Sequence, residues 1–177
     1  ACWGVVTEKH RLIIFGRYPF EQPWRPALAV ALLVALLVMG GIRRFWRAWL
    51  APLWVVGLGA VFVLMHGGTL GLDVVPTDRW GGLPLTILLA TLSILFAFPI
   101  AVLVALGRRS KLPAIRTFCV IYVELIRGVP LISVLFMASF LFPLFMPPGT
   151  SIDVLLRVLV GITLFSAAYM AEIVRGG

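Results

Sequence analysis

Residues 122–131 read YVELIRGVPL, and this stretch decides how the rest of the chain is interpreted. It places a carboxylate, Glu124, and a guanidinium, Arg127, three residues apart in a strongly apolar region, where helical spacing allows them to pair. Gly128 and Pro130 then interrupt the helical pattern, because proline has no backbone N–H to donate. We therefore predict a helix joint here. Ionisable groups at membrane depth are costly and are usually functional.

Composition places the chain in a membrane. Of its 177 residues, 62% are hydrophobic and only 12% are charged, which leaves too little polar surface for a soluble globular domain. The 15 Lys and Arg residues outnumber the 7 Asp and Glu residues, but they lie in short clusters between apolar runs. That pattern is typical of cytoplasmic loops rather than of a nucleic-acid-binding face. We expect the chain to lie in a lipid bilayer and not to bind nucleic acid.

Apolar runs of spanning length predict an all-α, polytopic membrane helix bundle. Residues 1–26 mix aromatic and basic side chains and are interpreted as an interfacial segment. Two accessory transmembrane helices are expected within residues 27–66, on either side of a short basic loop at 43–47. The individual elements are predicted at 27–42, 46–66, 83–107, 129–145 and 153–174, with an interfacial helix at about 114–126.

The short basic loops set the orientation. Residues 43–47 and 108–127 are both predicted to be cytoplasmic, so that 1–26, 67–82 and 147–152 are external. This count puts the amino terminus outside despite its four Lys and Arg residues. The conflict disappears if a further span precedes residue 1, and we therefore expect an upstream segment.

Several kinds of chemistry are not expected. No Walker A pattern is present, so the chain is not expected to bind ATP through a P-loop. His10 and His66 lack metal-ligand spacing, and the serines in the spans have no His and Asp constellation. Cys119 is interpreted as a buried core thiol, and a disulfide partner of Cys2, if any, is expected upstream. We predict neither a catalytic residue nor a metal site.

A second set of polar residues repeats the spacing of the first pair. Tyr169, Glu172 and Arg175 lie three apart on the last predicted helix. Both sets are open to two interpretations: local salt bridges that anchor helix ends at the interface, or supports of a moving joint. Thr86 and Ser93 are seven apart and share a helix face, where they either pack against a neighbouring helix or bond back to their own.

These motifs resemble a known family. YVELIRGVPL, followed by SAAYMAEIVRGG at 166–177, resembles the signature of inner-membrane permease subunits of polar amino acid ABC importers. WGGLPLTI at 80–87 and LGRRSKLPAIR at 106–116 resemble the start of the same transmembrane module. ACWG, FGRYP and WRPAL near the amino terminus resemble the M-type permease of a general L-amino acid transporter.

The resemblance implies a fold and partners. The fold would be the type I ABC importer transmembrane (MetI-like) fold, incomplete, with residues 80–177 as the N-terminal part of the module. The partners would be a second permease subunit, two cytoplasmic ATPase subunits and a periplasmic amino-acid-binding protein. ATP and Mg would be used by the partner ATPase, with no cofactor in this chain, which would be a transporter subunit and not an enzyme.

The resemblance also implies roles for particular residues. In the family a coupling loop with a Glu-Ala-Ala pattern follows the position matched by Arg175, Gly176 and Gly177. Tyr169 and Glu172 would then approach that loop, and the chain resembles a central fragment of a permease.

Glu124, Arg127, Gly128 and Pro130 would form a gating joint. A substrate-binding role for Glu124 is the weaker interpretation, because substrate sites in transporters lie nearer the membrane midplane. The substrate-contacting residues are left unassigned. The alternative function is a structural or anchoring subunit of another membrane complex, whereas an ion channel is disfavoured because no filter motif is present.

Overall fold

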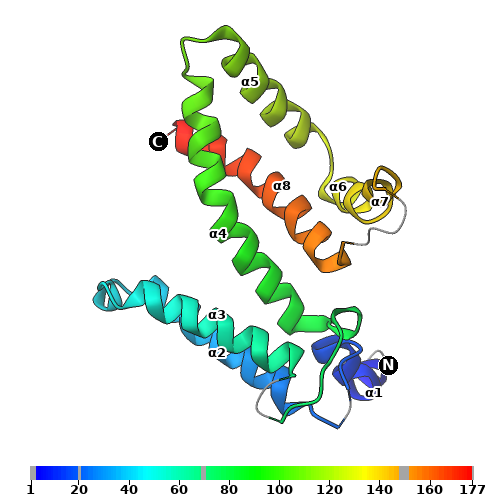
Figure 1. Ribbon diagram of the computed structural model, residues 1–177. Coiled ribbons are helices and arrows are strands. Elements are labelled where there is room, and N and C mark those ends of the chain that lie inside the picture. Colours follow the sequence, from blue (N-terminus) through cyan, green and yellow to red (C-terminus); the bar gives the residue numbers. More distant parts are fainter. Residues whose placement is uncertain (1–2, 20, 69–70, 148–151, 177) are drawn as a thin grey trace. The chain divides into compact units, whose positions relative to one another are not determined.

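The structure is a computed structural model that describes residues 3–19, 21–68, 71–147 and 152–176 (Figure 1). The chain divides into two compact units, residues 1–88 and 89–177, each described by itself below. Every regular element in the described part of the chain is helical. The helices are α1 (Trp3–Phe15), α2 (Trp24–Gly41), η1 (Arg43–Phe45), α3 (Leu50–His66), η2 (Thr77–Arg79), α4 (Gly82–Arg108), α5 (Pro113–Gly128), α6 (Leu131–Phe136), η3 (Met137–Leu141), α7 (Phe142–Leu144) and α8 (Val154–Gly176).

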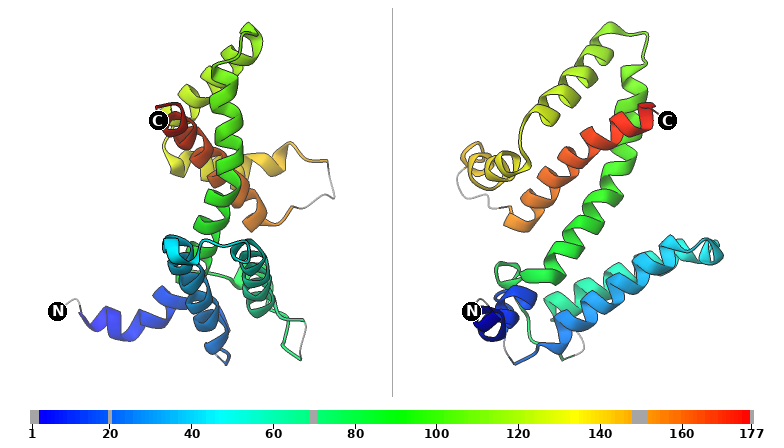
Figure 2. Two further views of the ribbon diagram at one scale, coloured as in Figure 1. Left: turned by 90° about the vertical axis from the view of Figure 1, so that its left-hand side faces the viewer. Right: turned by 180° about the vertical axis from the view of Figure 1, so that it is seen from behind.

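The first unit is built on a hairpin of α2 and α3, which lie side by side in both views of Figure 2. Leu33 and Leu36 of α2 are fully buried, as is Val61 of α3. Gly57 provides the close approach, because a Cβ at this position would lie 2.6 Å from Cδ1 of Leu36. Small residues at helix contacts are characteristic of membrane helices, which gain their packing energy from close approach.

A buried arginine closes the open end of this hairpin. The side chain of Arg25, at the start of α2, donates from Nε to the carbonyl of Leu64 at 2.7 Å and from Nη1 to the carbonyl of Asp73 at 3.0 Å. The Tyr18 hydroxyl donates to the carbonyl of Met65 at 3.1 Å. Arg25 and Tyr18 thus supply donors to the carbonyls of Leu64 and Met65, which have no intrahelical partner at the end of α3. Burial raises the pKa of Tyr18, against the opposing effect of Arg25, which keeps the hydroxyl a donor.

The turn after α3 depends on glycine. Gly67 has a φ of +77°, and a side chain there would collide with the backbone of Asp73. Only glycine adopts this conformation without strain. The turn thereby brings the Asp73 carbonyl to Arg25 and ties the end of α3 to the start of α2.

The second unit contains the rest of α4 together with α5, α6, α7 and α8. Its core joins Ala101 of α4, Val123 of α5 and Ala171 of α8, each with no exposed surface. Gly107 and Cys119 touch where α4 meets α5, since a Cβ on Gly107 would lie 2.5 Å from the Cys119 sulfur. The expectation that Cys119 is a buried core thiol is confirmed.

The predicted all-α membrane bundle is confirmed. Three helices are long and apolar enough to cross a membrane, and a fourth crossing results if the bent pair of α5 and α6–α7 counts as one span. They are Trp24–Gly41, Gly82–Arg108 and Val154–Gly176. The chain is therefore a multi-pass membrane protein.

The boundaries differ from prediction in two places. The helix predicted at 46–66 begins only at Leu50, because Trp46 lies in a turn where its indole N–H donates to the Gly40 carbonyl at 2.8 Å. The segment at 1–26, interpreted as interfacial, contains the helix α1, which its scattered charges did not reveal. Cys2, residues 148–151 and Gly177 lie outside the described residues, so the expectations on them stay untested.

Candidate functional site

One carboxylate near the end of α8 gathers arginines from three helices. Glu172 Oε2 accepts a hydrogen bond from Nη1 of Arg108, at the end of α4, and lies 3.7 Å from Nη1 of Arg127 on α5. Its other oxygen, Oε1, accepts from Arg175, one turn further along α8. The Arg108 side chain is only 7% exposed, so its charge is compensated mainly by Glu172. The ends of α4, α5 and α8 are thereby held together.

Glu124 forms the outer edge of the same cluster. It lies 3.9 Å from Nη2 of Arg108 and its side chain is 67% exposed. The i,i+3 spacing allowed Glu124 and Arg127 to pair with each other, but each instead reaches a residue of another helix. We call Arg108, Glu124, Arg127, Glu172 and Arg175 the Glu172 network. It sets three guanidinium groups against two carboxylates and so retains positive charge.

Tyrosine side chains also join α5 to α8. The Arg127 guanidinium carbon lies 5.7 Å from the centre of the Tyr169 ring, within the range of a cation–π contact. The Tyr122 hydroxyl of α5 donates to the carbonyl of Leu164 in α8 at 2.6 Å. The two motifs identified in the sequence, about 45 residues apart, therefore meet along the contact between α5 and α8.

The predicted break follows this contact directly. Helix α5 ends at Gly128, Val129 is extended, and Pro130, with φ −65° and ψ 144°, precedes the first turn of α6. The axes before and after the break differ by 104°. A Cβ on Gly128 would meet nothing within 4 Å, so there is open space beside this glycine.

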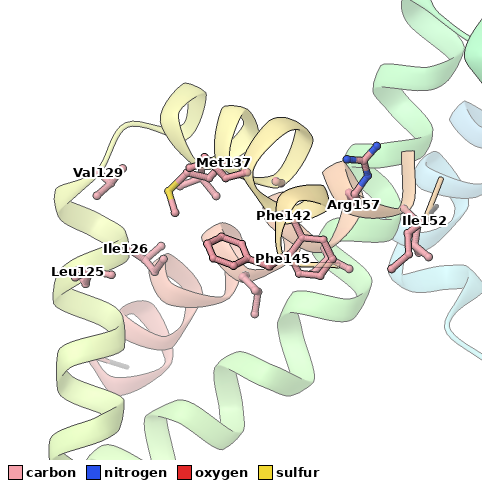
Figure 3. A pocket seen from close by; sticks show the side chains of 15 residues that line it. Leu125, Ile126, Val129, Met137, Phe142, Phe145, Ile152 and Arg157 are labelled. Atoms are coloured by element: carbon pink, nitrogen blue, oxygen red, sulfur yellow. The ribbon is translucent and has the colours of Figure 1, made fainter. Parts of the chain in front are cut away.

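Beyond the bend lies an apolar cavity of about 410 Å³. Figure 3 shows its lining side chains, contributed by the end of α5, by α6, η3 and α7, and by the first half of α8. Leu125 and Ile126 line one end and Ile152 the other (Figure 3). The segment after the break thus borders the cavity together with α8 and the end of α5, while an ion pair joins α5 to α8 before the break.

A contact made by Arg157, which also lines this cavity, was not predicted from the sequence. The Arg157 guanidinium on α8 donates from Nη1 to the carbonyl of Ser139 at 2.6 Å. Ser139 lies in η3, a turn of π-helix within the crossing that follows the break. Such turns often mark functional positions. At the start of α8 the Asp153 carboxylate accepts the backbone N–H of Leu155 at 2.7 Å.

Two of the hydroxyl residues of α4, Thr86 and Ser93, differ from each other. Thr86 Oγ1 donates to the carbonyl of Gly82 at 2.9 Å, which is the bond back to its own helix that one interpretation expected. Ser93 is 1% exposed, and its hydroxyl has no hydrogen-bond partner among the described residues.

The fold and the charged cluster define a polytopic helical membrane protein with a broken span and a charged joint between helix ends. No protein-family model matches the chain, and no solved structure does. The sequence is 45% identical over 183 aligned positions to the inner membrane amino-acid ABC transporter permease protein YhdY of Escherichia coli (strain K12), covering all of this chain and 49% of that protein.

Two further relatives agree. The chain is 32% identical over 234 positions to BztC, the glutamate/glutamine/aspartate/asparagine transport system permease protein of Rhodobacter capsulatus, covering all of this chain and 54% of that protein. It is 34% identical over 116 positions to the L-cystine transport system permease protein TcyB of Bacillus subtilis, covering 63% of this chain and 48% of that protein.

The chain spans about half the length of the curated relatives it matches. It is a homologue of the amino-acid ABC transporter permeases, which confirms the resemblance drawn from its motifs.

Proposed function

We propose that the chain is part of the permease subunit of an ATP-driven amino acid importer in a bacterial inner membrane. The observation that carries the proposal is the similarity, over the whole of this chain and about half of each relative, to proteins named as permeases of amino-acid transport systems. The structure adds support, because the two motifs on which the resemblance rests contact each other through the Glu172 network.

The energy for transport would enter from partners. Two cytoplasmic ATPase subunits would bind ATP and Mg, a second permease subunit would complete the translocation path, and a periplasmic binding protein would deliver the amino acid. This chain would contribute helices and no hydrolytic chemistry. Closure of the ATPase pair would move the helix ends, and the path would change the side to which it opens.

The proposed topology follows the basic loops. Residues 43–47 and 108–127 face the cytoplasm, and residues 1–26, 67–82 and 147–152 are external. Cysteines introduced at Ser110 and Asp78, in a chain carrying Cys2→Ala and Cys119→Ala, test this in intact cells. A membrane-impermeant maleimide is expected to label the cysteine at 78 and to reach the one at 110 only after permeabilisation. Labelling of 110 in intact cells would contradict the orientation.

We assign the Glu172 network to the gating joint. It ties α5 and α8 on the near side of the break, whereas α6 and α7 border an apolar cavity on the far side. If the end of α8 moved, α5 would then move with it as a rigid unit. The change in direction would occur in the backbone at Gly128 and Pro130. Irregular backbone of this kind is placed by transporters where helices line a cavity or move.

Glu124 fits this role better than that of a substrate ligand. It is largely exposed and already lies near Arg108, at the end of α4 that is proposed to be cytoplasmic. A substrate ammonium group would have to compete with that guanidinium. Tyr169, Glu172, Arg175 and Gly176 would approach the coupling loop, and Gly177 would belong to the same approach.

Reconstitution tests the function. The complete permease is placed in liposomes with its neighbouring subunits and binding protein, and uptake of a panel of labelled amino acids is measured with and without ATP. We expect ATP-dependent uptake of at least one polar amino acid. A chain that assembles with its partners but supports no uptake of any amino acid would favour the anchoring subunit instead.

A further inference from the structure

The turn between α4 and α5 carries cations that the Glu172 network does not use. Arg109, Lys111 and Arg116 are all exposed. Within the described ranges no carboxylate lies within 4.0 Å of any of them, since the ion pairs there involve Arg108, Arg127 and Arg175. Arg109 donates only to a backbone carbonyl, that of Arg175, at 3.3 Å. Three positive charges at this turn thus lack a compensating charge.

Exposed apolar side chains alternate with these cations along the sequence. Leu112 is 60% exposed, Ile115 45% and Phe118 74%, whereas Cys119 and Val123 on the other side of α5 are buried. Helix α5 therefore turns one apolar side toward the bundle and a second one outward. Cations beside exposed apolar groups at a helix end are the combination that binds the boundary between lipid headgroups and acyl chains.

We propose that the α4–α5 turn binds an anionic phospholipid of the cytoplasmic leaflet. Arg109, Lys111 and Arg116 bind the phosphate, and Leu112 and Phe118 contact the glycerol and the first methylenes of the acyl chains. Charge complementarity selects this occupant, because basic residues at the cytoplasmic end of membrane helices attract anionic headgroups. The inference rests on the topology proposed above.

Helix α5 is the element that such a lipid would hold. It packs on α8 through Val123 and Tyr122 and ends at the break. A lipid bound at its first turn and the Glu172 network near its last turn would fix both ends of α5. The lipid would then stabilise the fixed side of the proposed joint.

Native mass spectrometry of the full chain measures the binding. The chain is extracted in detergent, mixed with phosphatidylglycerol or phosphatidylcholine of identical acyl chains, and the bound lipids are counted as a function of lipid concentration. Each unpaired cation near an anionic headgroup contributes about fivefold in affinity. We therefore expect a preference for phosphatidylglycerol that falls by roughly 100-fold in the triple variant Arg109→Gln/Lys111→Gln/Arg116→Gln.

A matched variant controls for net charge. Lys9→Gln/Arg17→Gln/Arg79→Gln removes the same three charges at exposed positions of residues 1–88. It is expected to keep the preference. Phe118→Gln is expected to weaken the binding of both lipids by the same factor, since it removes an apolar contact and leaves the cations in place. The proposal would be overturned if the control triple variant lost the preference for phosphatidylglycerol to the same extent, or if the unaltered chain showed no preference.

Two further measurements separate the alternatives. Raising the salt concentration is expected to reduce the preference, because exposed charges are screened. Inorganic phosphate at millimolar concentration is expected to leave the bound phosphatidylglycerol in place, and its displacement would show a soluble anion site instead. A preference for phosphatidylglycerol without amino acid uptake would refute the proposed transport function and support the lipid site. Amino acid uptake without a lipid preference would support the transport function and refute the lipid site.

Discussion

Replacing Glu172 by Gln tests whether one carboxylate holds the ends of three helices together. The substitution keeps the shape of the side chain and removes its charge, which Arg108, Arg127 and Arg175 share. Arg108 is almost completely buried and depends most on this charge. A hydrogen bond between charged groups contributes about 1.5 to 3 kcal/mol. The two more exposed partners, Arg127 and Arg175, add about 0.5 kcal/mol each.

We therefore expect Glu172→Gln to lower the free energy of unfolding by about 3 kcal/mol. Reversible unfolding of the purified chain in mixed micelles with increasing SDS measures this quantity. Glu124→Gln is the matched control, because the same chemical change is made at a carboxylate that is 67% exposed and 3.9 Å from Arg108. Its expected effect is below about 1 kcal/mol.

A double-mutant cycle with Arg108→Gln isolates the central contact. The coupling free energy between Arg108 and Glu172 is expected to be about 2 kcal/mol, because only this pair is largely withdrawn from solvent. Equal effects of the Glu172 and Glu124 substitutions, together with a coupling energy near zero, would refute the view that Glu172 organises the network.

Four other substitutions test individual positions. Gly107→Ala is expected to destabilise the chain by about 1 to 3 kcal/mol, since the new methyl group meets the Cys119 sulfur, and Cys119→Ala is expected to restore the loss. Arg25→Gln is expected to lower stability by about 2 to 4 kcal/mol in the same unfolding assay, since buried carbonyls lose a charged donor. Arg127→Ala is expected to reduce amino acid uptake in the reconstituted permease while the binding protein keeps its own affinity; Gly128→Leu is expected to do the same.

Each of these has a control in the same chain. Gly59→Ala places a methyl group where nothing lies within 4 Å, so it is expected to be neutral or slightly stabilising. Arg17→Gln removes an exposed charge close to Arg25 in sequence and is expected to change stability by less than about 0.5 kcal/mol. Full uptake with both Arg127→Ala and Gly128→Leu would show that the break is only a packing feature.

Much of the fold could be predicted because a helix that crosses a membrane needs an apolar run of a characteristic length. The run at 83–107 corresponds to α4 at Gly82–Arg108, and the run at 153–174 to α8 at Val154–Gly176. The break was also visible, because glycine and proline act on the backbone locally. Helix α1 was not, since it has no long apolar run and its charges are scattered along it. The π-helical turn at Met137–Leu141 has no sequence pattern of its own.

The sequence pattern singled out four of the five residues of the Glu172 network, all but Arg108, and did not indicate how they pair. Spacing along one helix brought out Glu124 and Arg127, but such spacing says nothing about a helix that packs alongside. Glu172 receives Arg127 because α5 and α8 pack in register, and Arg108 had been interpreted only as one charge of a basic loop. The Arg25 bonds were missed for the same reason: their acceptors are backbone carbonyls about 40 to 50 residues away, and carbonyls have no sequence signature.

The open space around Gly128 separates two explanations of the break. If the glycine were needed for close packing, a Cβ would collide with a neighbouring helix, as it would at Gly107. At Gly128 nothing lies in the way, although the chain changes direction there by 104°. The contribution of this glycine is therefore to the backbone, which it leaves freer to bend. Since the charges of Arg127 and Glu172 hold the chain immediately before it, bending there would move α6 and α7 and leave the Glu172 network intact.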